Sequence, residues 1–258
     1  MRIARFSTAD GQPRFGIVDG DDLVVLAGDP MFSGFETLDE RVPLADVKLL
    51  APVIPRSKVV CVGLNYAEHR DDMTGVAAGP STPLIFLKPN TAVVGPGDAI
   101  QLPQGVGKIV HEGELVAVIG RIAKRVKAED YADYVFGYTI GNDVSARDLM
   151  VADGQWSRAK GFDTFAPIGP WIETELDPQA LEISTTVDGE PRRHGFTRDM
   201  IHPIGEIIAF VSDVFTLLPG DIIMTGTPGG LGGIEPGQRV DITISGIGTL
   251  TNPAVARP

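Results

Sequence analysis

The sequence predicts a mixed α+β protein that is mostly β, with few helices. Short apolar runs rich in β-branched residues dominate the chain, and turn-forming dipeptides such as DG and PG separate them. The 31 glycines and 20 prolines are spread between the runs rather than clustered. The predicted strands lie in KVVCVG, PLIFLK, ELVAVIG, FGYTIGNDV, LEISTTV, GDIIMTG and RVDITISG.

The first 55 residues form a pattern of their own. RIARFS, RFGIVDGDDLVVL and ETLDERVPL predict a short β-meander, and LLAPVIPRSK reads as a proline-punctuated connector. No later shift in composition marks a second boundary. We therefore expect a small N-terminal β domain over residues 1–55 and one larger domain over residues 56–258.

Two segments have helical features. Ser145 and Asp148 have the spacing of a capping box, which predicts a helix that begins at Ser145. A second helix is expected from near Pro203 through IGEIIAFVSDVFTLL, because its isoleucines and Val211 recur at helical spacing.

Bulk composition excludes several classes of partner. Asp and Glu number 34 against 22 Lys and Arg, and the resulting net charge of −12 argues against binding to nucleic acid or anionic membranes. Cys61 is the single cysteine, so no intramolecular disulfide or thiolate metal cluster is possible, and we expect it to be a small buried apolar residue. No apolar run reaches membrane-spanning length, and the expected location is cytoplasmic.

Glu112 and Glu114 stand two residues apart at the start of an apolar strand. In a strand such residues share a face, with Cα atoms about 7 Å apart. Two buried carboxylates there would be costly unless a cation compensates them. One interpretation is a solvated strand end with ordinary surface charges. The other is an oxygen-only metal site suited to Mg²⁺, Mn²⁺ or Ca²⁺.

TIGNDVSARD supplies a candidate third ligand. Asp143 ends an apolar strand, where it is expected to be either a local turn residue or a metal ligand. Arg147 follows in the first turn of the predicted helix, where the helix dipole disfavours a cation. We therefore expect Arg147 to pair with a nearby carboxylate or an anionic substrate.

Three further motifs have both a structural and a chemical interpretation. Lys160 is either a surface residue or, beside a metal, a group that holds substrate oxygens or an enolate. His69 and Asp72 are either an exposed helical turn or an orienter-plus-base pair able to activate water. GDIIMTGTPGG offers backbone N–H groups and the Thr227 hydroxyl to a carboxylate, but it lacks a P-loop lysine, which argues against nucleotide binding.

The order of these motifs is more specific than any one of them. Together they strongly resemble the fumarylacetoacetate hydrolase family from about Lys58 to the end, and the first fifty-odd residues resemble the small N-terminal β domain of some bacterial members. The segments that carry the resemblance are VGLNYAEH, FLKPNTAVVGPGD, HEGELVAVIGR, GYTIGNDVSARD, KGFDTFAPIGPWI and LLPGDIIMTGTPGGLG.

The resemblance implies a rolled mixed sheet with few helices, a catalytic metal-binding domain over residues 56–258, and a homodimer. It also implies a role for each motif position. The implied roles are metal ligands, normally to Mg²⁺, for Glu112, Glu114 and Asp143; a lysine beside the metal for Lys160; substrate contacts for Arg147 and Thr227; and a general base and its acid partner for His69 and Asp72.

Three positions depart from the family pattern. The acid partner of His69 is usually Glu and here is Asp72. Met150 and Arg193 stand where glutamine is common. These differences bear on how the distal end of the substrate is bound. We also predict a mobile lid over residues 65–80, which are small, polar and glycine-bearing.

The expected substrate is a small 2-oxo or diketo carboxylic acid that reacts through a metal-stabilised enolate. C–C hydrolysis of an acylpyruvate ranks first. The alternatives are isomerisation of 2-hydroxyhepta-2,4-diene-1,7-dioate and decarboxylation of a β-keto acid such as oxaloacetate. A different class also stays open, a non-catalytic paralogue that binds a metabolite through its metal.

Overall fold

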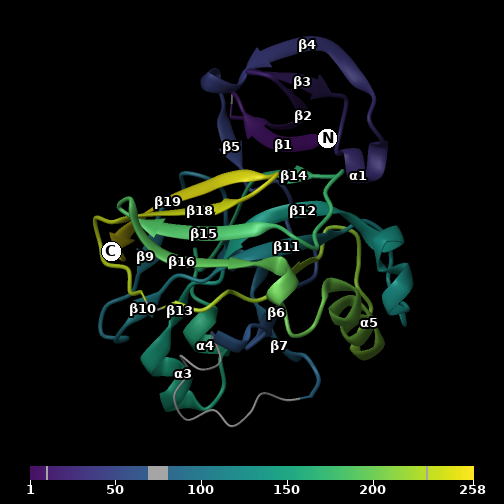
Figure 1. Cartoon of the computed structure of the whole chain (residues 1–258). Coiled ribbons are helices and arrows are strands. Elements are labelled where there is room, and N and C mark those ends of the chain that lie inside the picture. The colour runs from purple at the N-terminus through teal and green to yellow at the C-terminus, as the bar shows by residue number, and fades with distance from the viewer. Residues whose placement is uncertain (10, 69–80, 231) are drawn as a thin grey trace.

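The computed structural model describes residues 1–9, 11–68, 81–230 and 232–258. It shows a mostly β fold of mixed sheets with few helices, which confirms the predicted fold class (Figure 1). Among the described residues, the strands form a large twelve-stranded sheet, a five-stranded sheet and a two-stranded ribbon.

The large sheet has the strand order β4-β3-β2-β1-β14-β12-β11-β17-β6-β7, with β5 paired to β1 and β8 paired to β14. Its strands are β1 (Arg2–Ser7), β2 (Pro13–Asp19), β3 (Asp22–Leu26), β4 (Thr37–Pro43), β5 (Lys48–Leu50), β6 (Val59–Gly63), β7 (Leu84–Lys88), β8 (Val93–Val94), β11 (Gly113–Ile119), β12 (Val135–Asn142), β14 (Ala166–Glu173) and β17 (Ile222–Met224).

The smaller sheets and the helices complete the fold. The five-stranded sheet runs β16 (Glu190–Phe196), β15 (Glu182–Val187), β18 (Arg239–Ile244), β19 (Gly248–Ala256), β9 (Ile100–Leu102), and the ribbon pairs β10 (Ile109–Val110) with β13 (Ser145–Ala146). The α-helices are α1 (Pro30–Ser33), α3 (Arg147–Asp153), α4 (Ser157–Lys160) and α5 (Ile204–Val214); the 3-10 helices are η1 (Leu44–Asp46), η2 (Asn90–Ala92), η3 (Ala128–Tyr134) and η4 (Thr197–Asp199). None of the helices in the described ranges is long and apolar enough to span a membrane.

The N-terminal meander joins the large sheet rather than standing apart from it. β1 pairs antiparallel with β2 on one side and with the end of β14 on the other, with Arg2 opposite Glu173. The chain's amino group also donates to the Glu173 carboxylate. Figure 1 shows this meander in purple above the rest of the molecule. Because strand pairing continues from the meander into β14 of the larger domain, the domain boundary at residue 55 stays a prediction.

The centre of the large sheet is buried on both faces. Leu115 to Ile119 of β11 are fully buried, because β12 and β17 flank this strand and the other layers cover it. β17 pairs in parallel with β6, which places Met224 beside Cys61. Cys61 is buried, as predicted.

Helix α5 confirms the second predicted helix, with a shorter C-terminal end. Ile204, Ile207, Ile208 and Val211 lie on its buried face, in the predicted register. The helix ends at Val214, four residues earlier than expected, because Phe215 turns to an extended conformation. Gly205 lies so close to η3 that an added Cβ would sit 2.5 Å from the Ala128 carbonyl oxygen.

The predicted capping box at Ser145 is wrong. Ser145 belongs to β13, opposite Val110 of β10, and α3 begins only at Arg147 without a side-chain cap. The Ser145 hydroxyl instead donates to Glu112 Oε2 at 3.3 Å. Ser145 therefore pairs with the neighbouring strand and bonds to a buried carboxylate, and it does not cap the helix as its spacing to Asp148 predicted.

Candidate active site

Strand pairing between β11 and β12 brings the three acidic side chains together. Gly113 lies opposite Asn142 and Glu114 opposite Gly141, and the Asp143 N–H donates to the Glu112 carbonyl at 2.9 Å. The Asn142 side chain accepts from the Glu112 N–H at 2.9 Å and fixes this end of the pair. Glu112 and Glu114 leave one strand on the same face, and Asp143 leaves the neighbouring strand beside them.

The resulting cluster is compact and buried. One carboxylate oxygen each from Glu112, Glu114 and Asp143 lies within 4.8 Å of the others. The three residues are only 3%, 2% and 1% exposed, respectively. The interpretation of Glu112 and Glu114 as ordinary surface charges is therefore wrong, while the convergence that a metal site requires is present.

Two buried lysines neutralise part of this charge. Lys160 Nζ lies 2.7 Å from Glu112 Oε2 and 2.5 Å from Asp143 Oδ2. Lys88 Nζ lies 2.5 Å from Asp143 Oδ1 and donates to the Val144 carbonyl at 3.1 Å. Burial alone would lower the pKa of Lys160, but Asp143 and Glu112 outweigh it, so the pKa lies above its ordinary value and the amine is charged.

Glu114 has less compensation than its two neighbours. The Gly226 N–H donates to its Oε2 at 2.8 Å, but neither lysine forms an ion pair with it. Burial raises the pKa of Glu114 well above its ordinary value, and the nearby Asp143 and Glu112 charges raise it further. This carboxylate is therefore the member of the cluster that most needs an added cation.

Arg147 and Thr227 lie beside the carboxylate cluster. Arg147 Nη1 is 3.9 Å from Glu112 Oε1, which supplies the expected carboxylate partner. Thr227 lines the same small cavity as the three carboxylates, and its buried hydroxyl has no hydrogen-bond partner within the described ranges. A buried hydroxyl without a partner is uncommon, and here it points to a group bound in the cavity.

The cavity fits a divalent cation. Its volume is about 10 Å³, which is roughly the space of one water-sized sphere. All three charged donors are oxygens, the set that hard cations such as Mg²⁺ and Mn²⁺ prefer. Lys88, Lys160 and Arg147 all pair with Glu112 or Asp143, and none of these three cations forms an ion pair with Glu114. Donor chemistry, space and charge all agree with the predicted metal site.

The remaining predicted residues differ in where they fall. His69 and Asp72 lie outside the described residues. So does the lid predicted over residues 65–80, apart from its first four positions. Met150 is buried and lines the cavity. Arg193 does not line it; its Nη1 donates to the Pro228 carbonyl at 2.7 Å.

Two residues of the site were not found from the sequence. Lys88 closes β7 at the end of the apolar run PLIFLK, and a charge in that position carries the same signal that singled out Glu112. Trp156 lines the cavity and contacts the ring of Phe86 edge-on, and the centroid of its ring lies 5.7 Å from Lys160 Nζ. Its contact depends on Gly63, where an added Cβ would lie 2.5 Å from the indole ring.

Family models match nearly the whole chain. Residues 58–255 match the fumarylacetoacetate hydrolase C-terminal domain, and residues 1–52 match the Rv2993c-like N-terminal domain. Protein Rv2993c of Mycobacterium tuberculosis is 51% identical over all of this chain and 99% of its own. A Bacillus subtilis protein named oxaloacetate tautomerase YisK is 42% identical over 81% of this chain and 73% of its own.

Solved structures agree over the full length. A 5-carboxymethyl-2-hydroxymuconate delta-isomerase from Mycobacterium smegmatis has a TM-score of 0.92 and 49% identity, with both chains fully covered. A maleylpyruvate hydrolase from Sphingobium sp. SYK-6, in complex with manganese(II) and pyruvate, has a TM-score of 0.84 and 33% identity, again with both chains fully covered. The carboxylate cluster described above thus lies in a chain that belongs to the fumarylacetoacetate hydrolase family.

Proposed function

We propose that the protein is a divalent-metal-dependent enzyme that acts on a small 2-oxo carboxylic acid through its enolate. The observation that carries this proposal is the convergence of Glu112, Glu114 and Asp143 beside the charged amine of Lys160, in a cavity with room for one ion. The manganese and pyruvate bound to the maleylpyruvate hydrolase support the same ligand class here. Mg²⁺ is the expected ion, with Mn²⁺ and Ca²⁺ as alternatives.

Each side chain has a defined task in this proposal. The three carboxylates would hold a divalent cation, which would supply Lewis-acid chemistry at the site. Lys160 would add a fixed positive charge next to that site. Arg147, which lies 3.9 Å from Glu112, and the Thr227 hydroxyl in the cavity wall would bind the substrate's carboxylate. Met150 and Trp156 keep one wall of the cavity apolar and reduce its access to water.

The first candidate reaction is C–C hydrolysis of an acylpyruvate. His69, oriented by Asp72, takes a proton from water, and the water oxygen bonds to the distal carbonyl carbon. The bond between that carbonyl carbon and the pyruvate methylene then breaks, and the carbonyl carbon leaves as the second carboxylic acid. The electron pair of the broken bond forms the enolate of pyruvate, and protonation of its methylene carbon gives the methyl group of pyruvate.

The second candidate is proton transfer alone, as in tautomerisation of oxaloacetate or isomerisation of a hydroxydienedioate. The names of two relatives favour it, since the delta-isomerase and the oxaloacetate tautomerase are 49% and 42% identical to this chain, against 33% for the hydrolase. Here His69 removes a proton from the carbon next to the carbonyl and the proton returns at another atom. No water is consumed and no C–C bond breaks.

One set of assays separates these reactions. Purified protein with Mg²⁺ or Mn²⁺ is given an acylpyruvate, oxaloacetate and 2-hydroxyhepta-2,4-diene-1,7-dioate, and pyruvate release, enol decay, CO₂ release and diene absorbance are followed. We expect turnover of at least one substrate that EDTA abolishes. Glu114→Gln should abolish it too, whereas Glu182→Gln, at an exposed carboxylate of β15, should not. Failure to turn over any of the three would defeat the proposal.

A non-catalytic metabolite-binding protein would behave differently. It would bind Mg²⁺ and oxalate, measurable by calorimetry, without turning over any substrate. His69→Ala distinguishes the two cases: an enzyme loses turnover but keeps metal and oxalate affinity, whereas a binding protein has no turnover to lose.

A further inference from the structure

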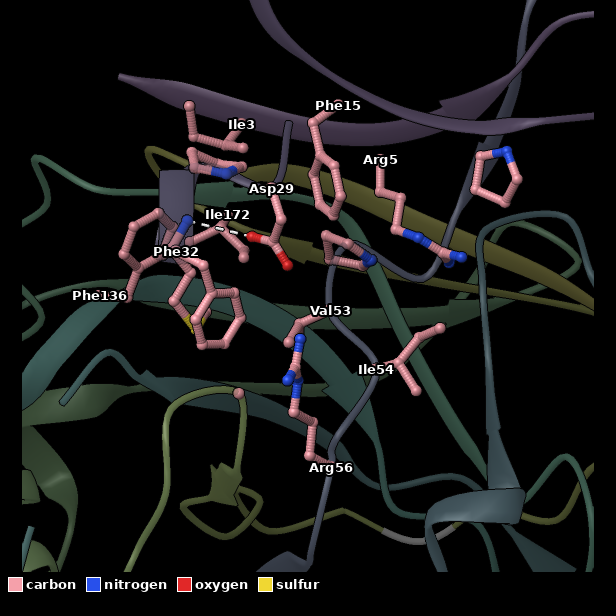
Figure 2. Close-up of a pocket in the computed structure, with 15 residues that line it drawn as sticks. Ile3, Arg5, Phe15, Asp29, Phe32, Val53, Ile54, Arg56, Phe136 and Ile172 are labelled. Atoms are coloured by element: carbon pink, nitrogen blue, oxygen red, sulfur yellow. Dashed lines mark hydrogen bonds between the residues drawn. The ribbon is translucent and has the colours of Figure 1, made fainter. Parts of the chain in front are cut away.

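A second cavity lies where the N-terminal meander meets the large sheet. Its volume is about 390 Å³, within the usual range for small-molecule sites. β1, β2, α1, the connector after β5, and strands β12 and β14 contribute its walls (Figure 2). The walls are mainly apolar, and include Ile3, Phe15, Val53, Phe136 and Ile172.

This cavity is distant from the carboxylate cluster. Phe136 lines it at the start of β12, whereas Asp143 follows the last residue of the same strand. Seven residues of strand separate the two positions by about 23 Å. Among the residues that the structure describes, none lines both this cavity and the small cavity around Glu112, Glu114 and Asp143.

Two arginines line the cavity without an ion pair to any described carboxylate. The half-buried Arg5 makes one long hydrogen bond, from Nη1 to the Ala51 carbonyl at 3.4 Å. Arg56 lies with its guanidinium carbon 4.2 Å from the centroid of the Phe32 ring. In Figure 2 the Arg56 side chain rises from the connector toward this ring. A guanidinium has five N–H donors, so most of those on Arg5 and Arg56 are available to a ligand.

The one acidic residue in the wall, Asp29, already has a structural role. Its Oδ1 accepts from the Met31 N–H at 3.0 Å and caps α1. The cavity wall therefore carries two positive charges and one negative charge, in a protein whose net charge is −12. Burial lowers the pKa of the Arg5 guanidinium, and the negative charge of Asp29 only partly offsets this, so an added anion would stabilise the charged form of Arg5.

We propose that this cavity binds a small organic carboxylate with an apolar body, such as an aryl-acetate. The carboxylate would pair with Arg5 and Arg56, since the planar guanidinium matches carboxylate geometry. The apolar body would lie against Phe15, Ile172 and Phe136. Phe32 and Ile54 at the same cavity are 50% and 56% exposed, and a bound ligand would cover part of that apolar surface.

The test uses phenylacetate as the probe and phenylacetamide as its neutral counterpart. Methyl NMR of the full chain in EDTA reports binding by location, because Ile3 and Ile172 line this cavity whereas Val62 and Leu64 line the carboxylate site. We expect saturable shifts of the Ile3 and Ile172 methyl groups with phenylacetate and much weaker ones with phenylacetamide.

Arginine variants test the charge pairing. Arg56→Met should weaken phenylacetate binding about tenfold or more, the usual size of a lost charge-assisted hydrogen bond. Arg56 is exposed, so this variant tests the site even if Arg5→Met fails to fold. Arg41→Met, at an exposed arginine of β4 that pairs with Asp19, is the matched control and should bind like the unmodified chain.

Several results would overturn the proposal. These are the absence of shifts at Ile3 and Ile172, equal responses to acid and amide, shifts confined to Val62 and Leu64, or equal losses in Arg56→Met and Arg41→Met. A fifth is a pair of findings: the chain binds no phenylacetate, and it forms a dimer that Phe32→Asp dissociates. A second copy of the chain would then cover this face.

Discussion

At the scale of single residues, substitution of Thr227 tests the candidate site most directly. Its hydroxyl is buried without a partner in the described structure, so Thr227→Val removes nothing that holds the fold together. We expect the free energy of unfolding to change by less than about 0.5 kcal/mol, while KM for a 2-oxo acid rises about tenfold through loss of one substrate hydrogen bond. Chemical denaturation and steady-state kinetics measure the two effects.

Thr225 supplies the matched control for that substitution. Its hydroxyl is also buried, but it donates to the Leu115 carbonyl at 2.9 Å. Thr225→Val should therefore cost about 1 kcal/mol of stability. A Thr227→Val variant that loses as much stability as Thr225→Val, with an unchanged KM, would assign Thr227 to the fold instead of the substrate.

Lys88 is expected to hold the site together before any metal binds. Lys88→Met leaves Asp143 paired with Lys160 alone, and breaking a buried ion pair commonly costs about 3–5 kcal/mol. We expect a loss of this order in EDTA, measured by urea denaturation. Mg²⁺ should restore more stability to Lys88→Met than to the unmodified chain, because the variant cavity carries one more uncompensated negative charge.

Lys48 provides the surface comparison. It pairs with Asp98 at 2.7 Å, but its side chain is 60% exposed. Exposed pairs contribute between about 0 and 1 kcal/mol, so Lys48→Met should have little effect with or without Mg²⁺. Equal behaviour of the two variants would show that Lys88 does not support the carboxylate cluster.

At the scale of elements, Asp221 connects the starts of two central strands. Its carboxylate accepts from the Ser57 hydroxyl at 2.6 Å, the Lys58 amine at 2.6 Å and the Leu218 N–H at 2.8 Å. Burial alone would raise the pKa of Asp221, but these hydrogen bonds outweigh it and hold the pKa below its ordinary value. The bonded carboxylate therefore fixes β6 beside β17.

The sign of this shift sets a pH dependence. A carboxylate with a lowered pKa in the folded state stabilises the fold above its unfolded-state pKa of about 3.9. That stability is lost as the pH falls through the folded-state pKa. Asp221→Asn should cost about 2 kcal/mol at pH 7, and the difference should shrink below about pH 4 in denaturation series. Asp213→Asn, at an exposed carboxylate that pairs with Arg125 at 3.8 Å, is the surface control and should cost less than about 1 kcal/mol at pH 7.

Local sequence patterns predicted those strands and helices whose burial shows in their own residues. β-branched runs located β6, β11 and β17, and helical spacing located α5, because both signals come from the segment itself. Glu112 and Glu114 were informative because two charges in an apolar strand need a reason. Lys88 was missed because its partner, Asp143, is 55 residues away, and only tertiary structure brings the two together.

Ser145 shows why a local motif can mislead. The spacing to Asp148 fits a helix cap, but pairing with β10 and the bond to Glu112 compete for the same residue. The extension of the large sheet through β1 and β14 was also beyond local reasoning, since Arg2 and Glu173 are far apart in sequence.

At the scale of the whole molecule, metal binding should raise thermal stability. A ligand that binds only the folded state at one hundred times its Kd adds about 2.7 kcal/mol. For a chain of this length, that corresponds to an increase in Tm of about 5–10 °C. We expect this response to Mg²⁺ or Mn²⁺ in thermal melts and its loss in Glu114→Gln. Identical melts with EDTA and with either ion would contradict the metal site.

We also propose that the protein is a homodimer, as the family resemblance implies. The chain mass is 27.4 kDa, so light scattering coupled to gel filtration should give twice that mass. A concentration-independent mass of one chain would contradict this proposal.

The parallel pairing of β6 with β17 has a consequence for how the protein is made. Val59 pairs with Ile222, so a ribosome must synthesise more than 160 further residues before β6 can gain this neighbour. Contacts between such distant segments generally slow folding. Until β17 emerges, the Val59–Gly63 edge is open to pairing with other nascent chains, so chaperone protection during translation should improve the yield of active protein.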